Sequence, residues 1–237
     1  MKKIALLTIF VFLGSVSSQM DPDPKRFYSG ANGDEVFIDE FLRWDQKNTD
    51  HKSGILFVGS SSIRKWATAE YFDQLPILNR GFGGSHISDI NYYFDSIVKI
   101  YNPRIIVLYA GDNDMAYKKT PEQVLEDYKE FVDLVRRNLP KTKIIYLPIK
   151  PSPSRWSIWG NMKQANSIIK MYIDSDKMQH YVDTATPMLD TNGKPYSHLF
   201  VEDSLHLSNE GYDLWSTVLA HTLDSLGRLE KVRLFGW

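Results

Sequence analysis

Five short apolar runs, each followed by a segment with helical periodicity, constrain this chain more than any other feature of its sequence. The runs cover residues 55–58, 76–79, 104–109, 143–147 and 181–184, and the helical segments around them cover 36–46, 63–72, 88–100, 121–138, 161–174 and 209–226. Strands that alternate with helices in this way are typical of a parallel sheet with helices on both faces. The pattern predicts an α/β protein with a five-stranded parallel sheet in a three-layer sandwich.

Composition limits the number of domains and the kinds of partner and site that this chain can have. The chain has 237 residues, of which 43% are apolar, and no composition shift follows residue 25, so we expect one folded domain. Its 28 basic and 29 acidic residues give a net charge of -1, which provides no reason to expect a nucleic-acid partner. The absence of cysteine excludes disulfides, thiolate metal sites and a cysteine nucleophile.

The N-terminus has the three-part pattern of a secretory signal peptide. Lys2 and Lys3 precede an apolar run at 4–13, and small residues follow at 14–18. The apolar run is too short to span a bilayer comfortably, and a buried N-terminal strand or helix fits the pattern less well. We therefore expect a signal peptide at 1–18, a domain at 19–237, a secreted or periplasmic location, and no stable membrane insertion.

The first apolar run ends at Gly59 and leads directly into three serines, Ser60, Ser61 and Ser62. Taken alone, such a cluster is more typical of a helix cap or a turn. Three later loops, each after a predicted strand or near the C-terminus, also have polar or glycine-rich sequences: RGFGGSH at 80–86, GDND at 111–114 and DSLH at 203–206. Loops that follow parallel strands meet at the carboxyl edge of the sheet. The four loops together therefore predict one shared site.

Acyl transfer requires a nucleophile, a general base, a group that orients the base, and donors for the oxyanion. Ser61 is the predicted nucleophile, and His206 is the predicted base that takes its proton. Asp203 lies three residues before His206, close enough to hold the tautomer of its ring. The predicted oxyanion donors are the backbone N–H groups of Gly84 and Ser61 and the side-chain amide of Asn113.

These blocks, in this order, resemble the SGNH hydrolase superfamily, or GDSL-type esterases and lipases, which is named for its Ser, Gly, Asn and His. The resemblance extends over 55–219, and GSSSIRKW is similar to the platelet-activating-factor acetylhydrolase-like branch. It implies a flavodoxin-like sheet and a serine esterase without a metal or organic cofactor. It also implies the site roles given above. The family usually has Asp where Ser60 stands, so Ser61 is chosen by its position two residues after Gly59, with Ser60 and Ser62 as alternatives.

The resemblance implies hydrolysis of a carboxylic ester through an acyl-enzyme. No long apolar lid is apparent, so we expect short acyl groups, with an acetylated carbohydrate as a small-molecule or glycan substrate. The alternatives are a lysophospholipase-type or other acyl hydrolase, and a non-catalytic carbohydrate-binding protein on the same fold. Trp156, in a proline-rich loop, is expected to line the substrate pocket, with a core-covering role as the alternative. His86 is expected to line the cleft or to be solvated.

Other kinds of site fit the sequence less well. The glycines at 81–84 lack the GxGxxG and GK[ST] patterns of nucleotide-binding loops. Asp112 and Asp114 lack the His and Asp partners of a metal-dependent phosphoesterase. Neither Ser61 nor Ser85 has the GxSxG context of an α/β-hydrolase nucleophile. The serine-based site is therefore the favoured hypothesis.

Overall fold

The computed structural model of the protein describes residues 21–27, 38–48 and 53–235, with side chains described up to residue 226. The predicted signal peptide at 1–18 lies outside the described residues, so its cleavage stays a prediction. Within the described ranges, no helix combines the length and the apolar composition that crossing a membrane requires.

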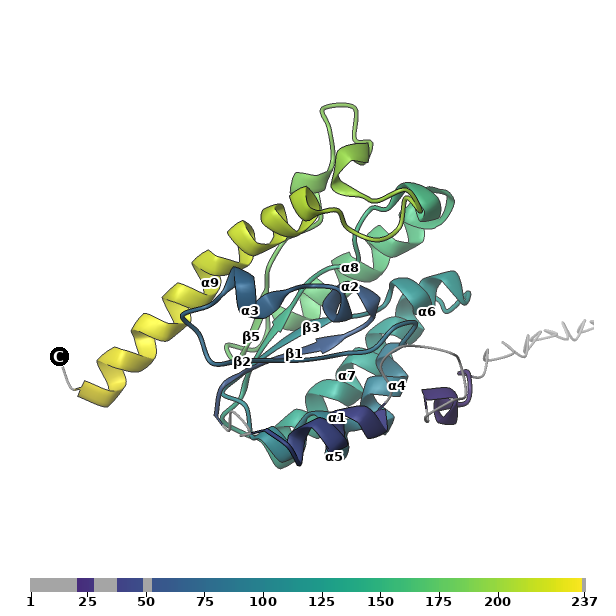
Figure 1. Cartoon of the computed structure of the whole chain (residues 1–237). Coiled ribbons are helices and arrows are strands. Elements are labelled where there is room, and N and C mark those ends of the chain that lie inside the picture. The colour runs from purple at the N-terminus through teal and green to yellow at the C-terminus, as the bar shows by residue number, and fades with distance from the viewer. Residues whose placement is uncertain (1–20, 28–37, 49–52, 236–237) are drawn as a thin grey trace, which may run out of the picture.

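A five-stranded parallel sheet forms the centre of the molecule (Figure 1). Its strands are β1 Ile55–Gly59, β2 Ile77–Gly81, β3 Ile105–Tyr109, β4 Lys143–Tyr146 and β5 Gln179–Tyr181, in the order β2-β1-β3-β4-β5. In register, Ile55 of β1 pairs with Ile77 on one side and with Ile105 on the other. This is the flavodoxin-like order, in which ligands bind beyond the carboxyl ends of β1 and β3. The predicted fold class is confirmed.

Helices cover both faces of the sheet. They are α1 Ile38–Asp45, α2 Ser61–Arg64, α3 Thr68–Tyr71, α4 Ile87–Tyr92, α5 Phe94–Ile97, α6 Asp112–Ala116, α7 Pro121–Asn138, α8 Trp159–Ile173 and α9 Asn209–Phe235. Short 3-10 turns lie at η1 Pro24–Phe27, η2 Lys99–Tyr101, η3 Pro153–Ile158, η4 Thr186–Met188 and η5 Ser197–Leu199. Helix α7 begins as predicted, because Thr120 caps it through a reciprocal bond pair with Gln123 and Pro121 occupies its first position.

Alternate residues of each strand point into two separate cores. Leu56 and Val58 of β1 pack with α1, α4, α5, α7 and α8, whereas Ile55 and Phe57 pack with α2 and α9 on the opposite face. Figure 1 shows α9 along one face of the sheet and α1, α4, α5 and α7 on the other. Because strands alternate their side chains between the two faces, apolar runs buried on both sides need two helical layers.

The following segments differ most clearly from the sequence-based expectations. The segment expected as one helix at 63–72 is two short helices, α2 and α3, and the one expected at 88–100 is divided into α4, α5 and η2. The last strand, expected at 181–184, ends at Tyr181, and α6 forms within a segment expected to be a loop. Helix α4 begins after His86 because the carboxylate of Asp89 accepts the His86 backbone N–H at 2.8 Å, which is a bond across the first turn.

Candidate active site

The turn from β1 into α2 presents Ser61 at the carboxyl edge of the sheet. Gly59 has a φ of +151°, and a Cβ there would lie 2.0 Å from the Tyr109 carbonyl oxygen, so only glycine fits. Ser60 takes the N-cap position of α2, and Ser61 is its first residue. Amides in the first turn of a helix lack an intrahelical acceptor. The Ser61 N–H is therefore suited to receive a negatively charged oxygen.

The three neighbouring serines have different surroundings. Ser61 Oγ lies 2.9 Å from His206 Nε2. Ser62 is buried, and its Oγ accepts a hydrogen bond from Lys150 Nζ at 3.2 Å. Ser60 is also buried, and its hydroxyl has no hydrogen-bond partner among the described residues. Of the three hydroxyls, the structure brings that of Ser61 to the imidazole.

A tight turn places Asp203 and His206 side by side. Buried Phe200 and Leu207 form a β-bridge that anchors its two ends in the core. Asp203 Oδ2 lies 2.5 Å from His206 Nδ1, and its Oδ1 accepts the N–H groups of Leu205 and His206, both at 2.8 Å.

The charge of Asp203 determines which ring nitrogen of a neutral His206 carries the proton. Asp203 has a side chain that is 47% exposed, and its partial burial opposes ionisation, but the hydrogen bonds from His206 and Leu205 lower its pKa to about 2. An ionised carboxylate only accepts hydrogen bonds, so the proton of a neutral imidazole lies on Nδ1 and its Nε2 can accept from Ser61.

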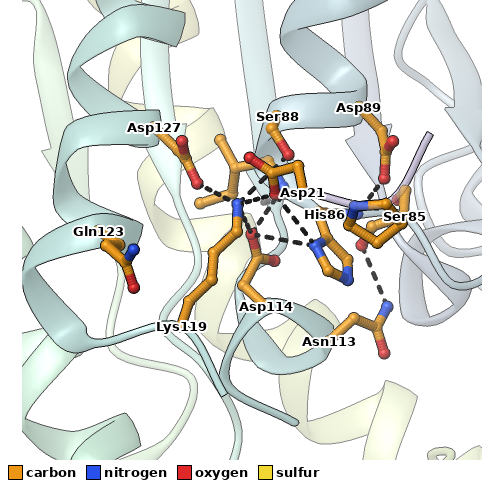
Figure 2. A network of polar contacts seen from close by, with 12 residues as sticks. Asp21, Ser85, His86, Ser88, Asp89, Asn113, Asp114, Lys119, Gln123 and Asp127 are labelled. Carbon is orange, nitrogen blue, oxygen red and sulfur yellow. Dashed lines mark hydrogen bonds and ion pairs between the residues drawn. The ribbon is translucent and has the colours of Figure 1, made fainter. Parts of the chain in front are cut away.

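The loops after β2 and β3 hold the other predicted donors. Gly84 has a φ of +74°, and no heavy atom of the described ranges lies within 4 Å of the position that a Cβ would take. The Asn113 side chain donates from Nδ2 to the Ser85 carbonyl at 3.1 Å, as Figure 2 shows, and its Oδ1 accepts from Arg155 Nη2 at 2.9 Å. An amide nitrogen carries two protons, so one N–H of Asn113 is left for a ligand.

A buried group of charges, which we call the Lys150 cluster, lies beneath these loops. Its members are Ser62, Tyr109, Asp112, Lys150 and Arg155. Lys150 is 1% exposed, and its Nζ lies 2.9 Å from Asp112 Oδ2, 3.0 Å from Tyr109 OH and 3.2 Å from Ser62 Oγ. Arg155 Nη1 lies 3.1 Å from the same Asp112 oxygen. Burial lowers the pKa of Lys150, and although burial opposes it, the two cations hold the pKa of Asp112 below its ordinary value.

A second group of charges, the Lys119 cluster, lies near Asn113 (Figure 2). Its members are Asp21, His86, Asp114, Lys119 and Asp127. Lys119 Nζ pairs with Asp21, lies 2.5 Å from Asp127 Oδ2 and lies 3.3 Å from Asp114 Oδ1. Burial raises the pKa values of Asp114 and Asp127 to about 6, against the opposing effect of Lys119.

The two residues expected to contact substrate lie in different surroundings. His86 has a side chain that is 5% exposed, with Nδ1 3.5 Å from Asp21 Oδ1 and the ring edge against Tyr117. A solvated His86 is therefore ruled out, because the residue packs into the Lys119 cluster, where burial lowers its pKa. A role for His86 in lining the cleft stays a prediction. Trp156 is partly exposed in η3 and stacks on Trp159, with ring centroids 6.2 Å apart.

The loop that carries Trp156 also touches the turn of Asp203 and His206. The Ser154 N–H donates to the Ser204 carbonyl at 3.0 Å, which joins η3 to that turn. A role for Trp156 in lining the substrate pocket stays a prediction.

Lys150 and Arg155 are the polar residues of this region that the sequence reasoning did not assign to the site. Lys150 closely follows the apolar run at 143–147, and a lysine so near the end of a buried strand was a signal available in the sequence. Nothing in the sequence pattern connects Arg155 with Asn113, because 42 positions separate them.

A hydroxyl, an imidazole and a carboxylate joined by hydrogen bonds are the means by which serine hydrolases activate a nucleophile. Here they lie at the carboxyl edge of a flavodoxin-like sheet, which defines the class of the protein. The model of the GDSL-like lipase/acylhydrolase family matches residues 58–214. The chain belongs to this family, within the SGNH hydrolase superfamily, and is a serine ester hydrolase.

Known proteins similar to this chain agree with that assignment. Human platelet-activating factor acetylhydrolase IB subunit alpha1 is 25% identical over 192 residues, which cover 77% of this chain and 80% of the relative. A GDSL-like lipase from Bacteroides thetaiotaomicron shares the fold with a TM-score of 0.69 at 19% identity, covering 80% of this chain and 98% of the other. A family 3 carbohydrate esterase from Clostridium thermocellum has a TM-score of 0.61 at 20% identity, covering 74% and 97%.

Proposed function

We propose that the protein is an exported serine esterase that removes short acyl groups, with acetylated carbohydrate as the favoured substrate class. The observation that carries the proposal is the continuous hydrogen-bond chain from Asp203 through His206 to Ser61. Its two links, Asp203 Oδ2 to His206 Nδ1 and His206 Nε2 to Ser61 Oγ, measure 2.5 Å and 2.9 Å. The link from His206 to Ser61 lies within the range over which a general base takes a proton, and the short link from Asp203 to His206 holds the imidazole in place.

In the first half of the reaction, Ser61 Oγ attacks the ester carbonyl while His206 Nε2 takes the hydroxyl proton. The carbonyl oxygen becomes an oxyanion, which the amides of Ser61 and Gly84 and the side chain of Asn113 stabilise. The tetrahedral intermediate collapses when His206 gives its proton to the departing alcohol, which leaves an acyl-enzyme on Ser61.

In the second half, His206 takes a proton from water, and the resulting hydroxide attacks the acyl carbonyl. The same donors stabilise the second oxyanion, and protonated His206 returns its proton to Ser61 Oγ as the acid leaves. Asp203 stays ionised in both halves, because its pKa is about 2, and it stabilises the imidazolium each time.

The names of similar proteins support a small acyl group. A relative is named an acetylhydrolase, and a structural neighbour is named a carbohydrate esterase. Platelet-activating factor, which that relative's name gives, is the second candidate substrate, and a lysophospholipid is a third. A purely carbohydrate-binding role is disfavoured, because binding alone requires no hydrogen-bonded serine, histidine and aspartate.

The decisive test measures hydrolysis of p-nitrophenyl acetate by the wild type and by the Ser61→Ala variant. We expect kcat to fall about 10⁴-fold or more in the variant, since the nucleophile is removed. Ser60→Ala is the matched control and is expected to keep most of the activity, because the Ser60 hydroxyl has no hydrogen-bond partner in the part of the chain that the structure describes. Equal rates for Ser61→Ala and the wild type would contradict the proposal.

Substrate class and export are tested separately. A suitable panel consists of an acetylated xylo-oligosaccharide, an acetylated choline phospholipid and p-nitrophenyl esters whose acyl chains have two to ten carbons. We expect the highest kcat/KM for the acetylated sugar and a steady fall as the acyl chain lengthens. For export, N-terminal sequencing of the protein secreted by a bacterial host should find Gln19 first, as the leader pattern predicts.

A further inference from the structure

Arg155 lies where the oxyanion amide and the Lys150 cluster meet. One terminal nitrogen of its guanidinium donates to Asn113 Oδ1 at 2.9 Å, and the other lies 3.1 Å from Asp112 Oδ2. Its side chain is 17% exposed, so both contacts are largely shielded from water. The residue therefore joins the predicted oxyanion donor to a buried carboxylate, although it is assigned no part in the acyl transfer described above.

The contact with Asn113 determines which way its amide faces. A guanidinium has donors only, so it can face the amide oxygen but not the amide nitrogen. The Ser85 carbonyl, on the other side, accepts only and faces Nδ2 at 3.1 Å. With Arg155 in place, a flipped Asn113 amide would point its N–H groups at the N–H groups of the guanidinium. Its oxygen would then face the carbonyl oxygen of Ser85. Without it, a water molecule could satisfy either orientation, and the preference for the donating one would weaken.

Arg155 is itself held by the rest of the Lys150 cluster. Asp112 shares one oxygen between Arg155 and Lys150, and Lys150 is anchored by Tyr109 and Ser62. Ser62 is the residue next to the nucleophile, so the cluster connects the serine turn with the oxyanion amide.

We propose that Arg155 is a positioning residue that keeps the Asn113 amide turned toward the oxyanion. It acts through Asn113, makes no bond to substrate, and contributes only while Asn113 is present. The inference rests on the proposed function, since it needs an oxyanion to form at this site. It predicts that loss of Arg155 lowers kcat and leaves KM nearly unchanged, because the oxyanion exists only after the attack.

A double-mutant cycle tests this directly with p-nitrophenyl acetate as the substrate. Arg155→Met removes both contacts but keeps a long side chain, and Asp112 retains Lys150 as its partner. We expect kcat to fall about 10- to 100-fold in Arg155→Met and about 100-fold or more in Asn113→Ala. Adding Arg155→Met to Asn113→Ala should lower kcat by no more than about twofold further, because the two residues act as one unit.

Several results would overturn the inference. One is an equal fall in kcat when Arg155→Met is made in the wild type and in Asn113→Ala, since the arginine would then act independently. Others are a fall that appears in KM alone and the absence of any fall. If Arg155→Met does not melt cooperatively, Arg155→Lys replaces it. Its single ammonium cannot reproduce the fork of the guanidinium, so an intermediate loss of kcat is expected.

A control arginine outside the site distinguishes an effect on the position of Asn113 from a general effect on protein stability. Arg136 is similarly paired, with Asp176 at 3.2 Å and the Thr142 carbonyl at 2.9 Å, but it lies on α7, and its partners are outside the site. Arg136→Met should lower the melting temperature and leave kcat unchanged. A wild-type protein that hydrolyses no ester would overturn the proposed function, whereas an active wild type with an unaffected Arg155→Met would overturn this inference alone.

Discussion

The Lys150 and Lys119 clusters invite comparison, because each is built on a buried lysine and each borders the loop that carries Asn113. The Lys150 cluster has two cations and one carboxylate, whereas the Lys119 cluster has one lysine, a histidine and three carboxylates. Burial raises the pKa values of Asp114 and Asp127 to about 6, whereas against the effect of burial Lys119 lowers the pKa of Asp21, and Lys150 and Arg155 lower that of Asp112. One cluster therefore keeps its charges in mild acid, and the other gains protons there.

The difference shows how two clusters, each built on a buried lysine, can support different parts of one site. The cationic Lys150 cluster adjoins the nucleophile turn through Ser62, and through Arg155 it orients the Asn113 amide. The acidic Lys119 cluster holds the loops together, since Asp114 accepts the Ile87 N–H and Lys119 bonds Ser88. Its third carboxylate, Asp21, comes from the N-terminal segment. We infer that the first cluster serves the chemistry and the second serves the fold.

Substitution of Lys119 or Lys150 should have the largest effect on stability. The two variants should also differ in how their stability depends on pH. Lys119→Met leaves three carboxylates without their cation, so we expect a loss of about 3–5 kcal/mol in the free energy of unfolding at pH 7.5. Part of this loss should be recovered at pH 5, because the carboxyls can take up protons. Urea unfolding at the two pH values measures it.

Lys150→Met is the matched variant for that experiment. Asp112 keeps Arg155 as its partner, so the stability loss should be smaller and should not recover at pH 5. Its kcat should fall, since the cluster adjoins the site, whereas Lys119→Met should keep most of its kcat at temperatures where it is folded. The same pH response in both variants would contradict the comparison.

A smaller effect on stability comes from the titration of the carboxyl groups in the Lys119 cluster. Asp127 has a folded pKa of about 6, raised by burial from an ordinary value of 3.8. A raised folded pKa means that the stability it contributes is full below the unfolded value and is lost as the pH rises through 6. Moving from pH 7 to pH 5 should therefore increase the contribution of Asp127 to the free energy of unfolding by about 1 kcal/mol.

Asp127→Asn removes this titration, so the difference in stability between pH 5 and pH 7 should shrink by that amount relative to the wild type. Asp176→Asn is the control, because hydrogen bonds lower the pKa of Asp176 despite the opposing effect of its burial, and it does not titrate in this range. Urea unfolding curves at the two pH values provide the comparison. An unchanged difference in Asp127→Asn would show that the Lys119 cluster does not gain protons in mild acid.

The fold could be predicted from the sequence because alternating apolar runs and helical segments depend on local periodicity alone. The boundaries that failed depend on contacts from elsewhere. Helix α4 begins at Ile87 because Asp114, 27 positions away, accepts the Ile87 N–H, and Asp89 accepts that of His86. Strand β5 is short and lies at the edge of the sheet, so its ends are set by its pairing with β4 rather than by its own residue pattern.

For the site, residue types and spacing were enough to nominate Ser61, Asp203 and His206, and the structure places these three within hydrogen-bonding distance. The supporting charges could not be nominated in the same way. Lys150 and Asp112 are 38 positions apart, and a buried lysine and an exposed lysine look alike in a sequence. Which cation meets which carboxylate is decided by the packing of loops.

The smallest expected effect separates two residues that the sequence placed together as substrate contacts. His86 is buried in the Lys119 cluster, whereas Trp156 is partly exposed on the loop bonded to the turn of Asp203 and His206. Trp156→Ala should therefore raise KM for p-nitrophenyl acetate by about 3- to 10-fold, which corresponds to the loss of a partly exposed aromatic contact. His86→Gln keeps a polar side chain in the cluster and should change KM by less than about twofold, with a lower melting temperature. A large KM effect in His86→Gln with no change in melting temperature would move His86 from the structural cluster to the substrate pocket.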